Sequence, residues 1–128
     1  CNLGEICYDE SVFNAANGLE WLPQNVAHEL GHGIDQRGGR QARDDLTAEW
    51  AADPNFPRRD PDNVERRGYA GLYFGWQQTQ SGTSSEEYAD MFLGWTYNRW
   101  SADAAGVTRS SWMSTNMPRW IALAVSGN

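Results

Sequence analysis

The sequence predicts a mostly helical α+β fold that forms one domain over residues 1–128. Three observations lead to this prediction. Several segments combine helix-start signals with an apolar face, a short stretch near the N-terminus suits a strand, and the chain length allows one modest core but not two ordinary domains. We therefore expect a helical domain with a small N-terminal strand or sheet remnant.

The N-terminal stretch of residues 3–8 (LGEICY) is apolar at its end and precedes the turn-forming residues 9–17. This pattern is typical of a short strand at a sheet edge. Cys1 and Cys7 are the only cysteines, so they can form one disulfide but indicate neither a disulfide framework nor a zinc knuckle.

The first predicted helix begins near Pro23, because proline is favoured in a first helical turn. Apolar residues then recur among polar ones until Gly38 and Gly39, which favour a helix end after about four turns. Residues 40–68 hold several prolines, so we expect an irregular surface segment with one helical turn around residues 45–52.

The second half of the chain predicts two more helices. Residues 69–76 (YAGLYFGW) favour either a strand or a packed loop. Ser84 followed by Glu87 is typical of a capping box that opens a helix through about Trp100. A final tryptophan-rich helix ends the chain, and Pro118 is expected to kink or restart it.

The charge balance excludes some classes of partner. Ten basic and seventeen acidic residues give a net charge of -7, which disfavours nucleic acid and anionic membrane surfaces as partners. No apolar run approaches the roughly 18 residues that would span a bilayer, and the chain does not start with the pattern of a signal peptide. We expect a soluble protein whose compartment is left open, secretion being one option.

The motif with the clearest chemistry is HELGH, residues 28–32. Helical spacing places His28 and His32 one above the other, so that both imidazoles can bind one metal ion. Glu29 is turned by about 100° from His28 and suits a general base that takes a proton from a zinc-activated water. These are the only two histidines in the chain. The sequence therefore predicts one catalytic Zn²⁺ ion.

A catalytic zinc needs a third protein ligand, and without a third histidine we expect a carboxylate. Glu86 is our choice, with Asp90 four residues later accepting the free N–H of a ligating histidine. The alternative for both acids is a solvated helix start, where the helix dipole favours negative charge. Asp35 is the other candidate ligand, although an ion pair with an arginine is its more usual role.

HELGH together with EEYAD at residues 86–90 resembles the zincin metallopeptidases of the gluzincin type, in particular anthrax-lethal-factor-like and thermolysin-like catalytic domains. The resemblance covers about a third of the chain. It implies a minimal zincin-like fold, zinc on His28, His32 and Glu86, and Glu29 as the base. It also implies a tyrosine near the site that stabilises the oxyanion, for which Tyr73 and Tyr69 are candidates, against the alternative that they pack in the core.

These residues predict a zinc metallopeptidase, an endopeptidase that acts on a peptide or protein substrate. Zincins usually have a sheet and a helix before the HExxH helix, whereas 27 residues precede His28 here. A partner chain or a missing N-terminal region is therefore part of the prediction. Two alternatives remain: a non-catalytic binding domain stabilised by zinc, and a regulatory protease with a single substrate.

Overall fold

The fold of the described residues consists of helices alone. The computed structural model describes residues 21–58 and 83–126, which are 80% helical and contain four helices and no strand. The predicted α+β class is therefore wrong, and the described chain is all-α. The stretches for which we considered a strand, residues 3–8 and 69–76, lie outside the described residues. The helices are α1 (Trp21–Arg37), α2 (Gln41–Ala52), α4 (Ser84–Tyr97) and α5 (Ala104–Ser126).

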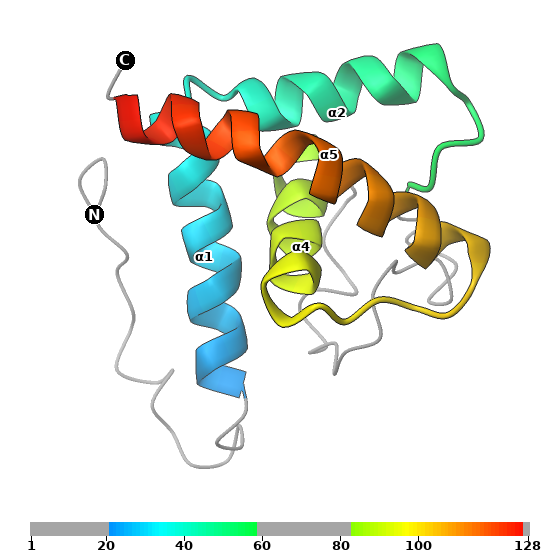
Figure 1. Cartoon of the computed structure of the whole chain (residues 1–128), viewed down its shortest axis with the longest axis horizontal. Helices are drawn as coiled ribbons and strands as arrows, with labels where there is room; N and C mark the ends of the chain where they lie inside the picture. The colour runs from blue at the N-terminus through cyan, green and yellow to red at the C-terminus, as the bar shows by residue number, and fades with distance from the viewer. Residues whose placement is uncertain (1–20, 59–82, 127–128) are drawn as a thin grey trace.

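Helices α1 and α4 lie side by side, and α2 and α5 run across them (Figure 1). Residue 28 of α1 lies opposite residue 90 of α4, and residue 32 lies opposite residue 86, so the two helices are antiparallel. The apolar faces of the helices cover one another, which removes the need for a sheet to bury them. The largest buried side chains of the core are Trp120, Tyr88, Leu46, Leu93, Met113 and Met117.

The close packing of α1 against α4 depends on Gly31, inside the HELGH motif. A Cβ atom added to Gly31 would lie 3.0 Å from the Cβ of Phe92 and 3.1 Å from the Cα of Ala89, both on α4. Contacts this short are tighter than ordinary van der Waals distances, so atoms of α4 would have to shift by a few tenths of an ångström, and packed helices have little room for such a shift. A Cβ atom added to Gly33, two residues later, would meet no neighbouring atom within 4 Å.

Helix α2 is longer and more regular than we expected, because it covers residues 41–52 rather than one turn. Its buried residues Ala42 and Leu46 are four residues apart on one face. The Asp35 carboxylate of α1 accepts a hydrogen bond from the Arg43 backbone N–H at 3.1 Å and so caps the start of α2. A cap supplied by another helix is not visible as a local sequence signal.

Helix α4 is close to its predicted extent, with different caps. The N-cap is Thr83 instead of Ser84, and its hydroxyl accepts the Glu86 N–H at 3.4 Å. The helix ends at Tyr97, three residues earlier than expected, because Asn98 takes a left-handed conformation with φ of 48°.

Helix α5 is continuous through Pro118. The Asp103 carboxylate accepts a hydrogen bond from the Gly106 N–H at 2.8 Å and caps its start. The expectation that Pro118 would restart the helix is therefore wrong, since tertiary packing of the buried residues on both sides, Met117 and Trp120, holds the helix together. No described helix is both long and apolar enough to cross a membrane.

Two acidic side chains of α2 join it to α5. Asp45 accepts hydrogen bonds from the Trp120 indole N–H at 2.7 Å and from the Arg119 guanidinium. Glu49 accepts a hydrogen bond from the Trp112 indole N–H at 3.2 Å. Both tryptophans also contact each other, with ring centroids 5.0 Å apart. α2 is thereby fixed across the end of the α1–α4 pair.

Replacing Gly31 with alanine is expected to lower the free energy of unfolding by about 1–3 kcal/mol, because the new methyl group would meet α4. Gly33→Ala is the matched control and is expected to raise it by about 0.5–1 kcal/mol, since alanine is the better helix former and has open space there. Urea unfolding followed by circular dichroism measures both. Equal effects of the two variants would contradict the close contact at Gly31.

The stabilisation that the hydrogen bonds of Asp45 give to the fold is expected to depend on pH. Burial raises the pKa of Asp45, but the hydrogen bonds led by that from Trp120 outweigh burial and hold the pKa below its usual value. A carboxyl with a lowered native pKa stabilises the fold above its unfolded pKa, near 4, and this stabilisation is lost as the pH falls through the native pKa. Asp45→Asn should thus cost about 1–2 kcal/mol at pH 7. The cost should shrink below about pH 4; a constant difference in urea unfolding at pH 3 and pH 7 would argue against this role.

Candidate metal centre

Three side chains that we selected from the sequence meet between α1 and α4. His28 and His32 extend from α1, and Glu86 from the first turn of α4. The two histidine Nε2 atoms are 3.1 Å apart. Glu86 lies with Oε2 at 3.4 Å from His28 Nε2 and Oε1 at 3.4 Å from His32 Nε2. The structure thus brings together residues that are more than fifty positions apart in the sequence.

The spacing of these atoms fits a tetrahedral metal ion. A tetrahedron with bonds of about 2.1 Å, the usual distance from zinc to nitrogen or carboxylate oxygen, has edges of about 3.4 Å. The observed separations of 3.1 to 3.4 Å are close to that edge length. The two Glu86 distances involve different carboxylate oxygens, and one ligand atom from each of the three residues lies within 4.8 Å of the other two. Two imidazole nitrogens and one carboxylate group thus surround a space of the size that a zinc ion requires, with a fourth position left over.

Asp90 orients the imidazole of His28. Its Oδ1 atom lies 2.9 Å from Nδ1 of His28, and both side chains are buried. This hydrogen bond keeps Nδ1 on Asp90 and leaves Nε2, which faces Glu86, as the atom of His28 that would bind a metal ion. A metal ion at the centre would take the place of the proton through which Nε2 contacts the Glu86 carboxylate.

Ser85 is a contact that the sequence analysis missed. Its Oγ atom lies 3.2 Å from Nδ1 of His32, so the second imidazole also has a partner behind it. The sequence did contain a signal for this contact, because Ser85 directly precedes Glu86 in the first turn of α4. On a helix antiparallel to α1, a side chain in this turn lies beside the later histidine of the pair, His32.

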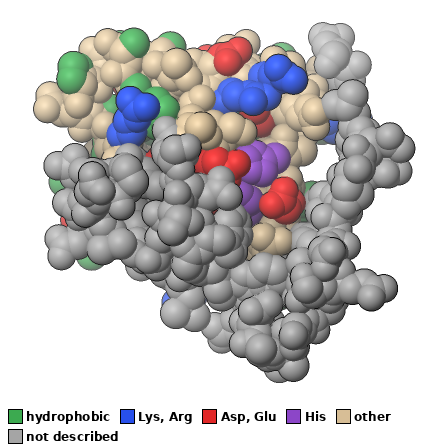
Figure 2. Space-filling view, turned by 180° about the vertical axis from the view of Figure 1, so that it is seen from behind, with side chains coloured by type: hydrophobic (Ala, Val, Ile, Leu, Met, Phe, Trp, Pro, Cys, Tyr) green, Lys and Arg blue, Asp and Glu red, His purple; other side chains and the backbone are tan. Residues whose placement is uncertain are grey.

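The centre is buried on one side and open on the other. The His28 side chain is 2% exposed, whereas those of His32 and Glu86 are 26% and 24% exposed. Figure 2 shows histidine side chains at the surface, next to acidic ones. Hydrogen bonds from His28 and then from His32 hold the pKa of Glu86 well below its usual range, so the carboxylate is charged at neutral pH. An anionic, partly open site suits a cation that must reach solvent or substrate.

The structure describes some of the other residues that we predicted for the site, and others lie outside the described residues. Glu29 is half-buried beside His28 on α1. Tyr73 and Tyr69 lie outside the described residues, so the proposed oxyanion role stays a prediction. Asp35 forms an ion pair with Arg43, at 3.0 Å between Oδ2 and Nε, which is the role expected of it if it is not a ligand.

Glu87 has a different role from the capping role that we predicted. The N-cap is Thr83, so the third residue of the helix, which is the position that completes a capping box, is Glu86. Glu87 lies one residue beyond that position. Its side chain is buried and forms an ion pair with Arg109 of α5, at 3.0 Å between Oε2 and Nη2. The predicted capping box of Ser84 and Glu87 is therefore wrong, because it begins one residue after the observed N-cap.

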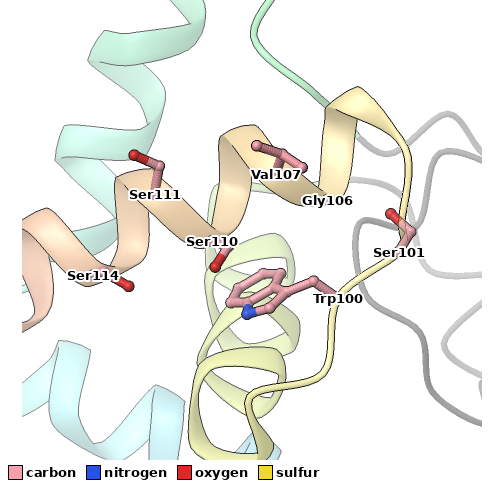
Figure 3. Close-up of a pocket in the computed structure, with 7 residues that line it drawn as sticks. All are labelled: Trp100, Ser101, Gly106, Val107, Ser110, Ser111 and Ser114. Atoms are coloured by element: carbon pink, nitrogen blue, oxygen red, sulfur yellow. The ribbon is translucent and has the colours of Figure 1, made fainter.

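A separate pocket of about 350 Å³ lies between the residues that follow α4 and the first half of α5 (Figure 3). None of the three candidate ligands lines it. Its lining contains no acid, base or histidine, so it provides no group for acid–base chemistry. The lining residues are Trp100, Ser101, Gly106, Val107, Ser110, Ser111 and Ser114.

Replacing Ser85 with alanine is expected to weaken zinc binding by roughly tenfold, because residues that orient ligating histidines typically contribute this much to affinity. Ser84→Ala is the matched control, as Ser84 is the preceding residue of the same helical turn and should leave the affinity unchanged. Competition with a chromophoric chelator measures both dissociation constants. If the two variants bind zinc equally well, Ser85 does not support His32.

No protein-family model, no curated protein and no solved structure matches this chain. The candidate metal centre is therefore defined by the residues of this chain and their geometry alone.

Proposed function

We propose that this protein is a zinc-dependent peptidase in which His28, His32 and Glu86 bind the metal ion. The observation that supports this best is the convergence of two imidazole Nε2 atoms, 3.1 Å apart, on a carboxylate whose two oxygens each lie 3.4 Å from one of them, which are distances close to the edges of a tetrahedron around zinc. The HExxH spacing supports it independently, because it supplies a carboxylate, Glu29, next to the first ligand.

Each side chain has a distinct task in the proposed reaction. When bound, zinc would supply a Lewis acid for the scissile carbonyl and lower the pKa of a water molecule from about 15.7 to near 7. Glu29 would take a proton from the water that attacks the carbonyl carbon and pass it to the amine nitrogen as the C–N bond breaks. Asp90 and Ser85 keep the two imidazoles oriented throughout.

The exposure of the site favours catalysis over a purely structural zinc. A structural site is closed by four protein ligands, whereas a catalytic one keeps a position for water or substrate. Here His32 and Glu86 are each about a quarter exposed, so one side of the centre can be reached. A non-catalytic binding domain would also have no use for Glu29. A protease with one protein substrate would share the same site and differ only in specificity.

Replacing Glu29 with glutamine is expected to keep one zinc ion per chain while lowering the rate of peptide hydrolysis by roughly 10²- to 10⁴-fold, the usual contribution of a general base. Metal analysis after dialysis measures the first quantity, and cleavage of a fluorogenic peptide library measures the second.

Asp44→Asn is the control, because it removes a carboxylate that is exposed on α2 and has no part in the centre. It should change neither zinc content nor rate. Full activity of the Glu29→Gln protein would rule out the base role, and a wild-type protein that binds no zinc would rule out the metal centre itself.

A further inference from the structure

The ion pair between Glu87 of α4 and Arg109 of α5 is the most deeply buried pair of opposite charges among the described residues. The two side chains are 2% and 0% exposed, and Nη2 of Arg109 lies 3.0 Å from Oε2 of Glu87. The proposed peptidase mechanism uses neither residue. Glu87 nevertheless directly follows Glu86, the one candidate ligand that α1 does not provide.

Stability alone is a poor explanation for such a pair. Removing two charges from water costs several kcal/mol per ion, and replacing a buried pair by apolar side chains of similar volume often leaves a protein equally or more stable. What a buried pair supplies better than apolar packing is direction, since a guanidinium and a carboxylate join in few geometries. Such a directional contact matters most beside a segment whose orientation decides which side chain reaches a site.

The first turn of α4 is that part. Successive residues of a helix point about 100° apart, so Glu86 and Glu87 cannot both face the histidines of α1. Each is a glutamate, and a rotation of the turn by one residue would exchange them. The N-cap bond from Glu86 to Thr83 is long, at 3.4 Å, and first turns are prone to fraying. An additional restraint decides which glutamate faces the metal centre.

We propose that Arg109 is a positioning residue that holds Glu87 on the α5 side of the helix and thereby directs Glu86 toward His28 and His32. The pair also offsets negative charge where Glu86, Glu87 and Asp90 lie within two turns. The contact between Glu87 and Arg109, on the side of α4 that faces α5, would in this way determine which glutamate becomes the third ligand of the site. This inference rests on the proposed metal centre and adds a determinant that lies outside it.

The test is a double-mutant cycle on zinc affinity with the full-length protein. Glu87→Gln should raise the zinc Kd by roughly 10- to 100-fold, as is typical for residues that orient a ligand. In a Glu86→Ala background the same change should have less than about a twofold effect, because its influence acts through Glu86. The visible absorption spectrum of the Co²⁺-loaded Glu87→Gln protein should shift toward that of Glu86→Ala.

Glu49→Gln is the matched control, because it also weakens a polar tie to α5, here to Trp112, at a distance from the centre. It should lower stability to urea without changing the zinc Kd or the Co²⁺ spectrum. Arg109→Lys provides a second variant, which keeps the charge but loses the planar head group, and should weaken zinc binding in the same background-dependent way.

Three results separate the possibilities. A Glu87→Gln protein that is less stable but has an unchanged zinc Kd would overturn the positioning role and leave the metal centre intact. Equal losses in the wild-type and Glu86→Ala backgrounds would overturn it too, because the effect would not pass through Glu86. Absence of zinc binding by the wild-type protein would instead contradict the proposed function, and the inference with it.

Discussion

The close approach of α1 and α4 at Gly31 is the constraint on which the described structure depends. Because the backbones nearly touch there, side chains as short as aspartate on α4 can reach histidines on α1. The antiparallel arrangement then pairs the earlier histidine with Asp90 and the later one with Glu86. A larger residue at Gly31 would press against α4 at the point where the polar side chains of the two helices meet.

The other two helices make this contact rigid. α5 packs against both α1 and α4, and α2 is held by carboxylates that bond to tryptophan side chains of α5 and by the Asp35 cap from α1. Polar atoms are thus used at the helix junctions, while the apolar surface fills the centre. The result is a small scaffold with charged side chains on both faces of α4, one set toward the candidate metal centre and one toward Arg109.

Much of the candidate site could be predicted because its signal is local. A pair of histidines at i and i+4 and two acids at the same spacing each define one face of one helix, and only their meeting required the structure. The failures involve non-local partners. The cap of α2 comes from Asp35 on another helix, and the role of Glu87 depends on Arg109, 22 residues away. The fold class was wrong because the strand in it rested on the short stretch of residues 3–8 and on the resemblance to zincins, whereas the residues that the structure describes are all helical or irregular.

The sequence distance between the two halves of the centre has a consequence for folding. Residues 28 and 90 meet only after 62 positions of intervening chain have closed into a loop, so the unfolded chain presents the histidine pair without its carboxylates. A ligand that needs all three side chains binds the folded state alone, and at a free concentration one hundred times its Kd it would stabilise that state by about 2.7 kcal/mol. For a chain with so modest a core, metal supply and the folded population would then be linked quantities, each rising with the other.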